Sequence, residues 1–439
     1  MSSENEPLIS SAEDETVRRD SRTLRDRALV WSGLAIVFIV VAVVALVNPG
    51  FVSDTGLSGK LPRDPKLAAQ RLLDTAPVID GHIDLPMVAR FGWRNNVTDV
   101  PLDGQMPMHV DIPRLREGKV GGFFWSVYVG CASPEDEGAD FLKATWRVRD
   151  TLEQIDVAKG LISKYPGDFA YAVSTSDIKS AIRNRKIASI LGVEGAHQLG
   201  NSIAVLRQYY ELGVRYVTLT HTCHNAFADS CGFLAPSVPR HYGLSPLGFR
   251  LVEEMNRLGM LVDLSHTSDM TATQALLHSK APVIWSHSSA RAIHDVARNV
   301  PDEVLGLVGF GEGQRDAVVM VNFNGPFVAD DGEADIEAVA DHVEHIAKVA
   351  GVQHVGIGSD YDGISVTPKG LEDVSKYPAL IAELHQRGWS KRDLAGLTGG
   401  NFLRVFEGAE KVAKELQAAG TLPKYDIYDK REDLPIYKP

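Results

Sequence analysis

Histidine and carboxylate residues follow several short apolar runs of this chain, and His82 and Asp84 form the clearest pair. They end the run at residues 78–84. Alternate side chains of a strand share a face, so both would point the same way. An imidazole and a carboxylate that converge at a strand end form half of a site for a borderline divalent metal such as zinc. His-x-Asp alone is a common pattern, so its weight depends on what ends the other runs.

Similar apolar runs further along the chain end in residues of the same kinds, in the order Glu194, His221, His266, His287 and Asp360. A lone histidine at a strand end is more often a hydrogen-bonded polar residue than a ligand. Four histidines and three carboxylates at one rim, however, would be costly to bury without a compensating cation. The pattern therefore predicts a metal site.

The elements that must position these residues alternate along the chain. Eight apolar runs, many rich in β-branched residues, occupy residues 76–80, 121–129, 187–193, 216–220, 261–264, 283–286, 318–323 and 355–358. Helix-like stretches between them include 141–159, 202–212, 246–258, 270–277, 336–349 and 377–386. Buried runs separated by helices indicate a parallel sheet covered on both faces. Eight of them favour an α/β fold of the (β/α)8 TIM-barrel type, whose active sites lie at the C-terminal strand ends.

The predicted rim holds more ligands than one tetrahedral ion needs. Two ions that share a carboxylate would use two sets, His82, Asp84 and Glu194 on one ion and Glu194, His266 and His287 on the other. Such a pair holds a hydroxide between the ions, polarises a carbonyl and stabilises the developing oxyanion. His221 and Asp360 would then be left for proton transfer or substrate contact.

Composition narrows the class of protein. The 439 residues are 44% hydrophobic and 23% charged, as in an ordinary globular protein, and the net charge of −12 argues against nucleic acid as a partner. The three cysteines, Cys131, Cys223 and Cys231, exclude a disulfide-built scaffold and a cysteine-rich zinc finger. One disulfide and one free thiol stay open for a domain outside the cytosol.

The N-terminal part predicts a membrane anchor. Residues 28–47 carry no charge and would span about 30 Å as a helix, the thickness of a bilayer's hydrocarbon core. Five arginines precede this run, which places residues 1–27 in the cytoplasm as a disordered tail and the rest of the chain in an extracytoplasmic space. A cleaved signal peptide is the alternative, but its apolar region is usually shorter. A stalk (48–64), a barrel domain (65–425) and a C-terminal extension (426–439) would follow.

Two short signals agree with this topology. Asn96 begins an Asn-Val-Thr glycosylation sequon on the outer side. Residues 4–9 are typical of an acidic dileucine sorting signal, which would direct the protein to a vacuolar or lysosomal membrane rather than the cell surface. The alternative is a plain disordered acidic tail.

Taken together, the motifs resemble those of the membrane dipeptidases (renal dipeptidase family, peptidase family M19), over residues 66–415. The segments that carry the resemblance are 78–86, 192–195, 219–221, 255–260, 262–266, 286–289, 298–302 and 358–363. The resemblance implies a (β/α)8 barrel with a binuclear zinc centre that hydrolyses dipeptides to free amino acids. It also implies the ligand sets named above, with Glu194 bridging two Zn²⁺ ions.

The resemblance assigns roles to three further residues. His221 matches the histidine that binds substrate and transition state, and Asp360 the acid that contacts the reacting centre and carries a proton to the leaving amine. Arg298 matches the arginine that pairs with the substrate's C-terminal carboxylate, a task suited to a guanidinium fork. Cys131 and Cys223 match a family disulfide, which leaves Cys231 unpaired.

Some properties stay open at the level of sequence. Mammalian family members carry a C-terminal lipid anchor instead of an N-terminal helix. They also have a tyrosine at the position that Asn324 occupies here, after Asn322 and Phe323, so the sequence does not fix the substrate preference. A homodimer like those of family members is a further expectation. A barrel metallohydrolase for N-acyl amino acids, β-lactams or lactones is the alternative enzyme, and cobalt or manganese the alternative metals. A catalytically inactive binding protein is disfavoured, because all five metal-ligand positions are filled.

Overall fold

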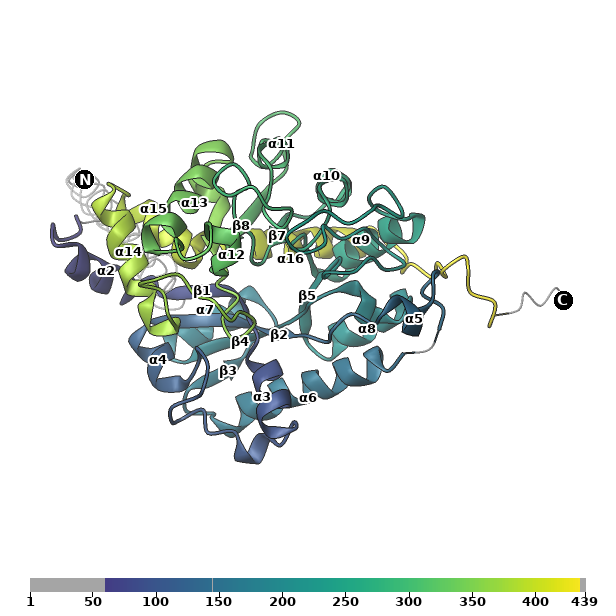
Figure 1. Cartoon of the computed structure of the whole chain (residues 1–439), viewed down its shortest axis with the longest axis horizontal. Helices are drawn as coiled ribbons and strands as arrows, with labels where there is room; N and C mark the ends of the chain where they lie inside the picture. The colour runs from purple at the N-terminus through teal and green to yellow at the C-terminus, as the bar shows by residue number, and fades with distance from the viewer. Residues whose placement is uncertain (1–59, 144, 435–439) are drawn as a thin grey trace, which may run out of the picture. The chain divides into compact units, whose positions relative to one another are not determined.

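The computed structural model describes residues 60–143 and 145–434 (Figure 1). The membrane helix expected at 28–47 and the cytoplasmic tail expected at 1–27 lie outside the described residues. Within the described part, no helix is both long enough and apolar enough to cross a membrane. The described residues from Leu61 onward form one compact unit.

Parallel strands form the centre of this unit. The strands in the described residues are β1 (Val78–Ile83), β2 (Val120–Val127), β3 (Phe169–Tyr171), β4 (Ile187–Val193), β5 (Val214–Thr218), β6 (Leu261–Asp263), β7 (Val283–Trp285), β8 (Ala317–Val321) and β9 (Val355–Ile357). Strand β1 pairs with both β2 and β9, and β2 pairs with β4, so that eight strands close into a barrel. The predicted eight-stranded barrel is confirmed, with strand bounds shifted by a few residues.

Helices follow most strands and cover the barrel. They are α2 (Pro65–Leu73), α3 (Leu85–Trp93), α4 (Ile112–Glu117), α5 (Pro134–Glu137), α6 (Arg147–Lys164), α7 (Thr175–Arg183), α8 (Ile203–Glu211), α9 (Pro246–Leu258), α10 (Asp269–His278), α11 (Asp302–Leu305), α12 (Gly325–Val328), α13 (Ile336–Val349), α14 (Tyr377–Gln386), α15 (Lys391–Ala395) and α16 (Asn401–Ala418). Several begin at a side chain that accepts a hydrogen bond from the first turn, such as Ser245 at α9 and Asp335 at α13.

Two local differences from the sequence expectations have physical reasons. The helix expected from residue 141 begins at Arg147. Phe141 itself has a left-handed backbone conformation with φ +59°, which a helix cannot include. Strand β3 was not expected. Its three residues pair with the first residues of β4, outside the closed barrel, and Tyr171 is exposed.

The barrel interior is a packed core of its own. Inward-facing side chains such as Ile79, Phe124 and Tyr216 meet there, and Phe402 and Phe406 of α16 pack against them. The outer faces of the strands and the helices form the larger second core. The interior is thus filled by side chains, which leaves the strand ends as the place for chemistry.

Candidate active site

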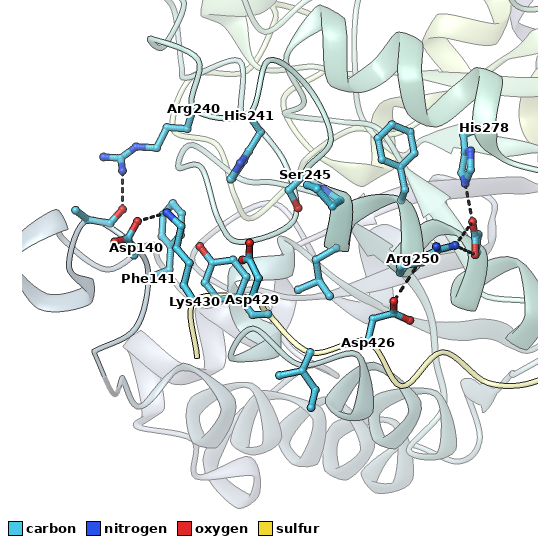
Figure 2. A pocket seen from close by; sticks show the side chains of 17 residues that line it. Asp140, Phe141, Arg240, His241, Ser245, Arg250, His278, Asp426, Asp429 and Lys430 are labelled. Atoms are coloured by element: carbon cyan, nitrogen blue, oxygen red, sulfur yellow. Dashed lines mark hydrogen bonds and ion pairs between the residues drawn. The ribbon is translucent and has the colours of Figure 1, made fainter. Parts of the chain in front are cut away.

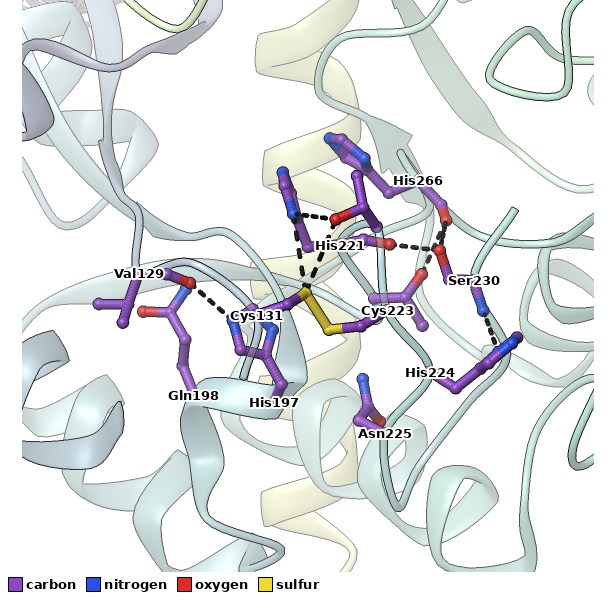
Figure 3. Close-up of a disulfide and its surroundings, with 12 residues drawn as sticks. Val129, Cys131, His197, Gln198, His221, Cys223, His224, Asn225, Ser230 and His266 are labelled. Carbon is purple, nitrogen blue, oxygen red and sulfur yellow. Dashed lines mark hydrogen bonds between the residues drawn. A yellow bond between two sulfur atoms is a disulfide. The ribbon is translucent and has the colours of Figure 1, made fainter. Parts of the chain in front are cut away.

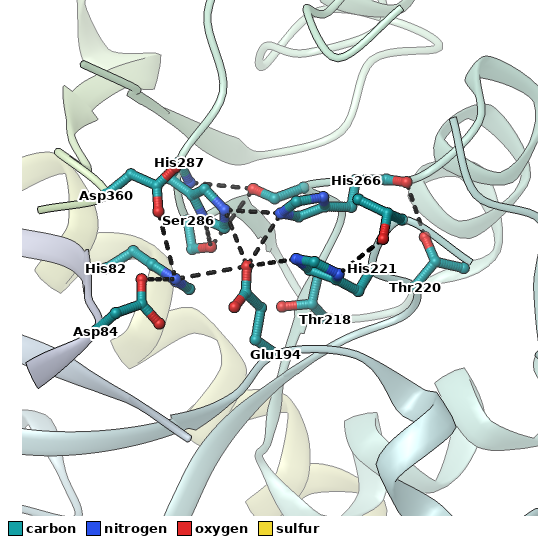
Figure 4. Close-up of polar contacts among 12 residues, drawn as sticks. His82, Asp84, Glu194, Thr218, Thr220, His221, His266, Ser286, His287 and Asp360 are labelled. Carbon is teal, nitrogen blue, oxygen red and sulfur yellow. Dashed lines mark hydrogen bonds and ion pairs between the residues drawn. The ribbon is translucent and has the colours of Figure 1, made fainter. Parts of the chain in front are cut away.

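The seven histidines and carboxylates predicted for the rim come together in one cluster, in which His221 is partly exposed and the other six residues are buried (Figure 4). His82 lies in β1, and Asp84 directly follows that strand. The other five residues each follow one strand: Glu194 follows β4, His221 β5, His266 β6, His287 β7 and Asp360 β9. Each therefore comes from a C-terminal strand end, and the closure of the barrel brings together residues that are far apart in the chain.

Two groups of potential ligands share Glu194. The His82 Nε2 atom lies 3.2 Å from Asp84 Oδ2 and 3.5 Å from Glu194 Oε1. On the other side, Glu194 Oε1 lies 3.0 Å from His266 Nε2 and 3.3 Å from His287 Nε2. Ligand atoms about 2.1 Å from one tetrahedral zinc lie roughly 3.4 Å from each other. Both groups have that spacing.

The chemistry of these atoms also fits cations. His82 Nε2 and Asp84 Oδ1 are buried and form no hydrogen bond with any described residue. The Nε2 atoms of His266 and His287 face each other at 3.0 Å, next to the Glu194 carboxylate. Imidazole nitrogens and carboxylate oxygens that converge this closely in a buried site are favourable ligands for a positive charge. The residues thus fit a metal centre.

Burial and neighbouring charged groups shift the pKa values of the histidines in the cluster. Burial lowers the pKa of His266 and His287 well below the usual value, which keeps both rings neutral. Burial also acts to lower the pKa of His82, but Tyr216, Glu194 and Asp84 raise it overall. The point between these two carboxylates is therefore where the cluster most favours a cation.

Asp360 is placed to hold a proton. Burial and the nearby Asp84 and Glu194 carboxylates raise its pKa to about 8, although His82 and Arg298 act to lower it. Its Oδ2 atom accepts a hydrogen bond of 2.9 Å from the Asn322 amide, and its Oδ1 lies 3.9 Å from His82 Nε2. A carboxyl group that is protonated near neutral pH is suited to general acid–base catalysis.

His221 is fixed by its own loop (Figure 3). Its Nε2 atom lies 3.6 Å from Glu194 Oε1, and its Nδ1 lies 3.1 Å from the Thr222 hydroxyl. Cys131 and Cys223 form a disulfide, the pairing that the resemblance implied, and Cys131 Sγ lies 4.0 Å from His221 Nδ1. The disulfide ties the loop after β2 to the loop that carries His221. The remaining cysteine, Cys231, is free and buried.

Arg298 is a buried cation beside the cluster, with an exposed fraction of 3%. It donates hydrogen bonds to the Ser288 hydroxyl and the His287 carbonyl, while its Nε has no partner. No carboxylate of the described residues forms an ion pair with it, which is unfavourable for a buried charge unless an anion binds there.

Supporting residues that the sequence analysis did not assign lie directly beneath the ligands. The Tyr216 hydroxyl is 2.8 Å from His82 Nδ1, and the Ser286 hydroxyl is 2.7 Å from His287 Nδ1. Ser286 in turn donates to Asp263, a carboxylate inside the apolar strand β6. A charged residue within an apolar run is the signal by which Asp263 could have been found.

A large cavity lies elsewhere in the described part (Figure 2). Its volume is about 880 Å³, and it lies between residues 139–141, α9 and the segment 426–430. None of the seven cluster residues lines it, and its charged groups are largely paired, as in the contacts Lys430–Asp140 and Arg250–Asp426. It therefore offers no catalytic arrangement, although its lining shows that the C-terminal extension packs against the barrel domain.

Comparisons with known proteins agree on one family. The model of the membrane dipeptidases (peptidase family M19) matches residues 67–420. Dipeptidase aclJ of Aspergillus oryzae is 42% identical over 412 residues, which cover 92% of this chain and 93% of that protein.

Solved structures give the same answer for the fold. A Rhodobacter sphaeroides metallopeptidase liganded with a phosphinate mimic of the dipeptide L-Ala-D-Ala matches with a TM-score of 0.67 and 27% identity, over 76% of this chain and 99% of that one. The probable dipeptidase PvdM of Pseudomonas aeruginosa matches with a TM-score of 0.69 and 23% identity, over 80% of this chain and all of that one, and at this identity shows the fold alone.

Proposed function

Since the chain belongs to the membrane dipeptidase family, peptidase family M19, we propose that its barrel site hydrolyses dipeptides to free amino acids with two zinc ions. The family makes it a metallopeptidase of the dipeptidase type. The observation that carries the finer proposal is the convergence of two ligand groups on Glu194, next to the unpaired buried cation Arg298.

The two ions would be held by the two groups described above, His82, Asp84 and Glu194 for one and Glu194, His266 and His287 for the other. When bound, they would lower the pKa of a water molecule to give a nucleophile at neutral pH and would polarise the scissile carbonyl. Burial of all five ligands keeps bulk water away from the site, which strengthens each electrostatic interaction in it.

Arg298 would orient the dipeptide by its C-terminal carboxylate. The guanidinium is already held by Ser288 and His287, so substrate binding needs little reorganisation of the side chain. An incoming carboxylate would remove the cost of an unpaired buried charge. This requirement favours free dipeptides over substrates that lack the carboxylate.

His221 and Asp360 would complete the reaction. Burial and neighbouring cations lower the pKa of His221 well below its usual value, so a neutral ring with hydrogen on Nε2 would donate to the developing oxyanion. With the cations bound, the Asp360 carboxyl would be ionised. It would then take the proton of the attacking water and deliver it to the amide nitrogen as the C–N bond breaks. The products are two free amino acids.

Activity and metal content of the full-length protein test the proposal. Asp84→Ala, Glu194→Gln and Asp360→Asn should each abolish dipeptide hydrolysis in protein that stays folded by circular dichroism. The wild type should contain two metal ions per chain and should lose activity on chelation. Zinc, cobalt and manganese would then be added separately to identify which metal restores the activity. Full activity in any of the three variants, or a preference for N-acyl amino acids, β-lactams or lactones in a substrate panel, would contradict the assignment.

We also propose that residues 28–47 anchor the enzyme with its barrel in an extracytoplasmic space, either the vacuolar lumen or the cell surface. Exposed Asn96 and an intrachain disulfide agree with such a compartment. The protein should resist alkaline extraction from membranes, and glycosidase should change the mobility of the wild type but not of Asn96→Gln. Release at alkaline pH would contradict the anchor. The homodimer stays a prediction, which light scattering of detergent-solubilised protein would test.

A further inference from the structure

Asp263 is a fully buried carboxylate surrounded by hydrogen-bond donors. Its Oδ1 atom accepts from the backbone N–H groups of Ser265 and Ser286, at 3.1 and 2.8 Å. Its Oδ2 atom accepts from the hydroxyls of Thr218 and Ser286, both at 2.6 Å. No described lysine, arginine or histidine forms an ion pair with it. Each carboxylate oxygen therefore accepts two hydrogen bonds.

Ser286, which lies beside His287 (Figure 4), connects this carboxylate to the ring. The hydroxyl has one hydrogen, and the 2.6 Å contact with Asp263 Oδ2 uses it. The Ser286 oxygen also lies 2.7 Å from His287 Nδ1, and there it must act as the acceptor. His287 Nδ1 therefore carries a hydrogen. In a neutral ring with its hydrogen on Nδ1, the Nε2 atom, which faces Glu194 and His266, keeps a lone pair.

We propose that Asp263 is a positioning residue that acts through Ser286 to fix His287 in the tautomer that a metal ion requires. Carboxylates commonly bind metal-ligating histidines directly, which fixes the tautomer and raises the basicity of the ligand. Here a serine stands between the two groups. The role of the tautomer in metal binding rests on the proposed function, whereas the tautomer itself depends only on these hydrogen bonds.

Asparagine at position 263 should reverse the arrangement. The two backbone N–H groups would keep the amide oxygen at the Oδ1 position, so the NH₂ group would take the place of Oδ2. It would then donate to Ser286, whose hydrogen would turn to His287 Nδ1. The ring would carry its hydrogen on Nε2 and lose the lone pair that faces Glu194.

Three variants separate this role from general packing. Asp263→Asn should reverse the tautomer, and Ser286→Ala should leave Nδ1 without its partner. Thr218→Val is the matched control, because it removes the other hydroxyl on the same carboxylate oxygen without touching the path to His287. Thermal unfolding shows whether each variant folds. If Asp263→Asn does not fold, the comparison of Ser286→Ala with Thr218→Val still tests the positioning role.

The first readout is the tautomer of His287 in the metal-free protein, from nitrogen chemical shifts after ¹⁵N labelling of histidine, with His287→Gln to assign the signal. The second is zinc affinity by competition with a chelator. We expect Nδ1–H in the wild type and Nε2–H in Asp263→Asn, and an affinity about 10–100-fold lower in Asp263→Asn and Ser286→Ala, against little change in Thr218→Val.

Nε2–H in the wild type, or affinity losses in Thr218→Val equal to those in the other two variants, would overturn the positioning role. If the wild type shows Nδ1–H and binds no divalent metal, the proposed function fails while the hydrogen-bond assignment stands.

Discussion

Gly192→Ala should weaken the metal centre, although the added methyl group would touch no ligand. Gly192 lies in β4 opposite Tyr216 of β5. A Cβ atom at position 192 would lie 2.1 Å from Cζ of the Tyr216 ring and 2.4 Å from both Cε atoms. The hydroxyl on that ring lies 2.8 Å from His82 Nδ1. The absence of a side chain at Gly192 therefore gives Tyr216 the space to reach His82.

The size of the effect follows from these distances. Non-bonded carbon atoms favour separations of about 3.5–4.0 Å, so the ring must move by roughly 1.5 Å. Overpacking of this kind costs about 1–3 kcal/mol. The same movement breaks the contact with His82, and loss of such a supporting hydrogen bond lowers metal affinity about 10–100-fold.

Thermal unfolding of the metal-free protein and chelator competition measure the two effects separately. Tyr216→Phe should lower metal affinity with a smaller loss of stability, because the ring still fills its place. Gly92→Ala is the control, since Gly92 is an exposed residue of α3 and a Cβ there meets nothing within 4 Å. It should be neutral or stabilising by about 0.5–1 kcal/mol. Wild-type metal affinity in both Gly192→Ala and Tyr216→Phe would refute the reasoning.

Three further outcomes are expected. Zinc binding at pH 7 should release about one more proton in the wild type than in Asp360→Asn. The Asp360 carboxyl, with a pKa of about 8, is protonated at pH 7, and a nearby cation favours its ionised form. The difference should vanish above pH 9, and titration in weak buffer would measure it. Arg298→Lys should raise KM for dipeptides about 10-fold or more and leave dipeptide amides unaffected in steady-state kinetics. Loss of the Cys131–Cys223 disulfide in the double serine variant should cost about 2–5 kcal/mol in the free energy of unfolding and lower kcat through His221, with metal content unchanged.

The barrel and its rim were predictable because their signals are local. A buried parallel strand is a continuous apolar run, and each potential ligand lies in such a run or within three residues of its end. Local patterns fail where structure depends on distant contacts. The short strand β3, for example, forms because β4 offers it a partner.

The supports of the ligands lie inside the strands, where a sequence pattern alone indicates core. Tyr216 lies in an apolar run and looks like a core residue in the sequence. It lies 134 positions from His82, and only the closure of the barrel brings the two side chains into contact. Two aspartates within the runs are more telling. Asp263 of β6 accepts from the backbone N–H of Ser286 after β7, and Asp80 of β1 accepts from that of Ser359 after β9.

In both cases an aspartate inside one strand holds the backbone just beyond the end of the neighbouring strand, one residue before a rim residue. Ser286 precedes His287 and Ser359 precedes Asp360. Burying a carboxylate there is favourable only because several donors converge on it. An ionisable residue inside an apolar run of a barrel is therefore evidence that the neighbouring strand end is held in place, and in this enzyme both of those ends carry residues of the candidate active site.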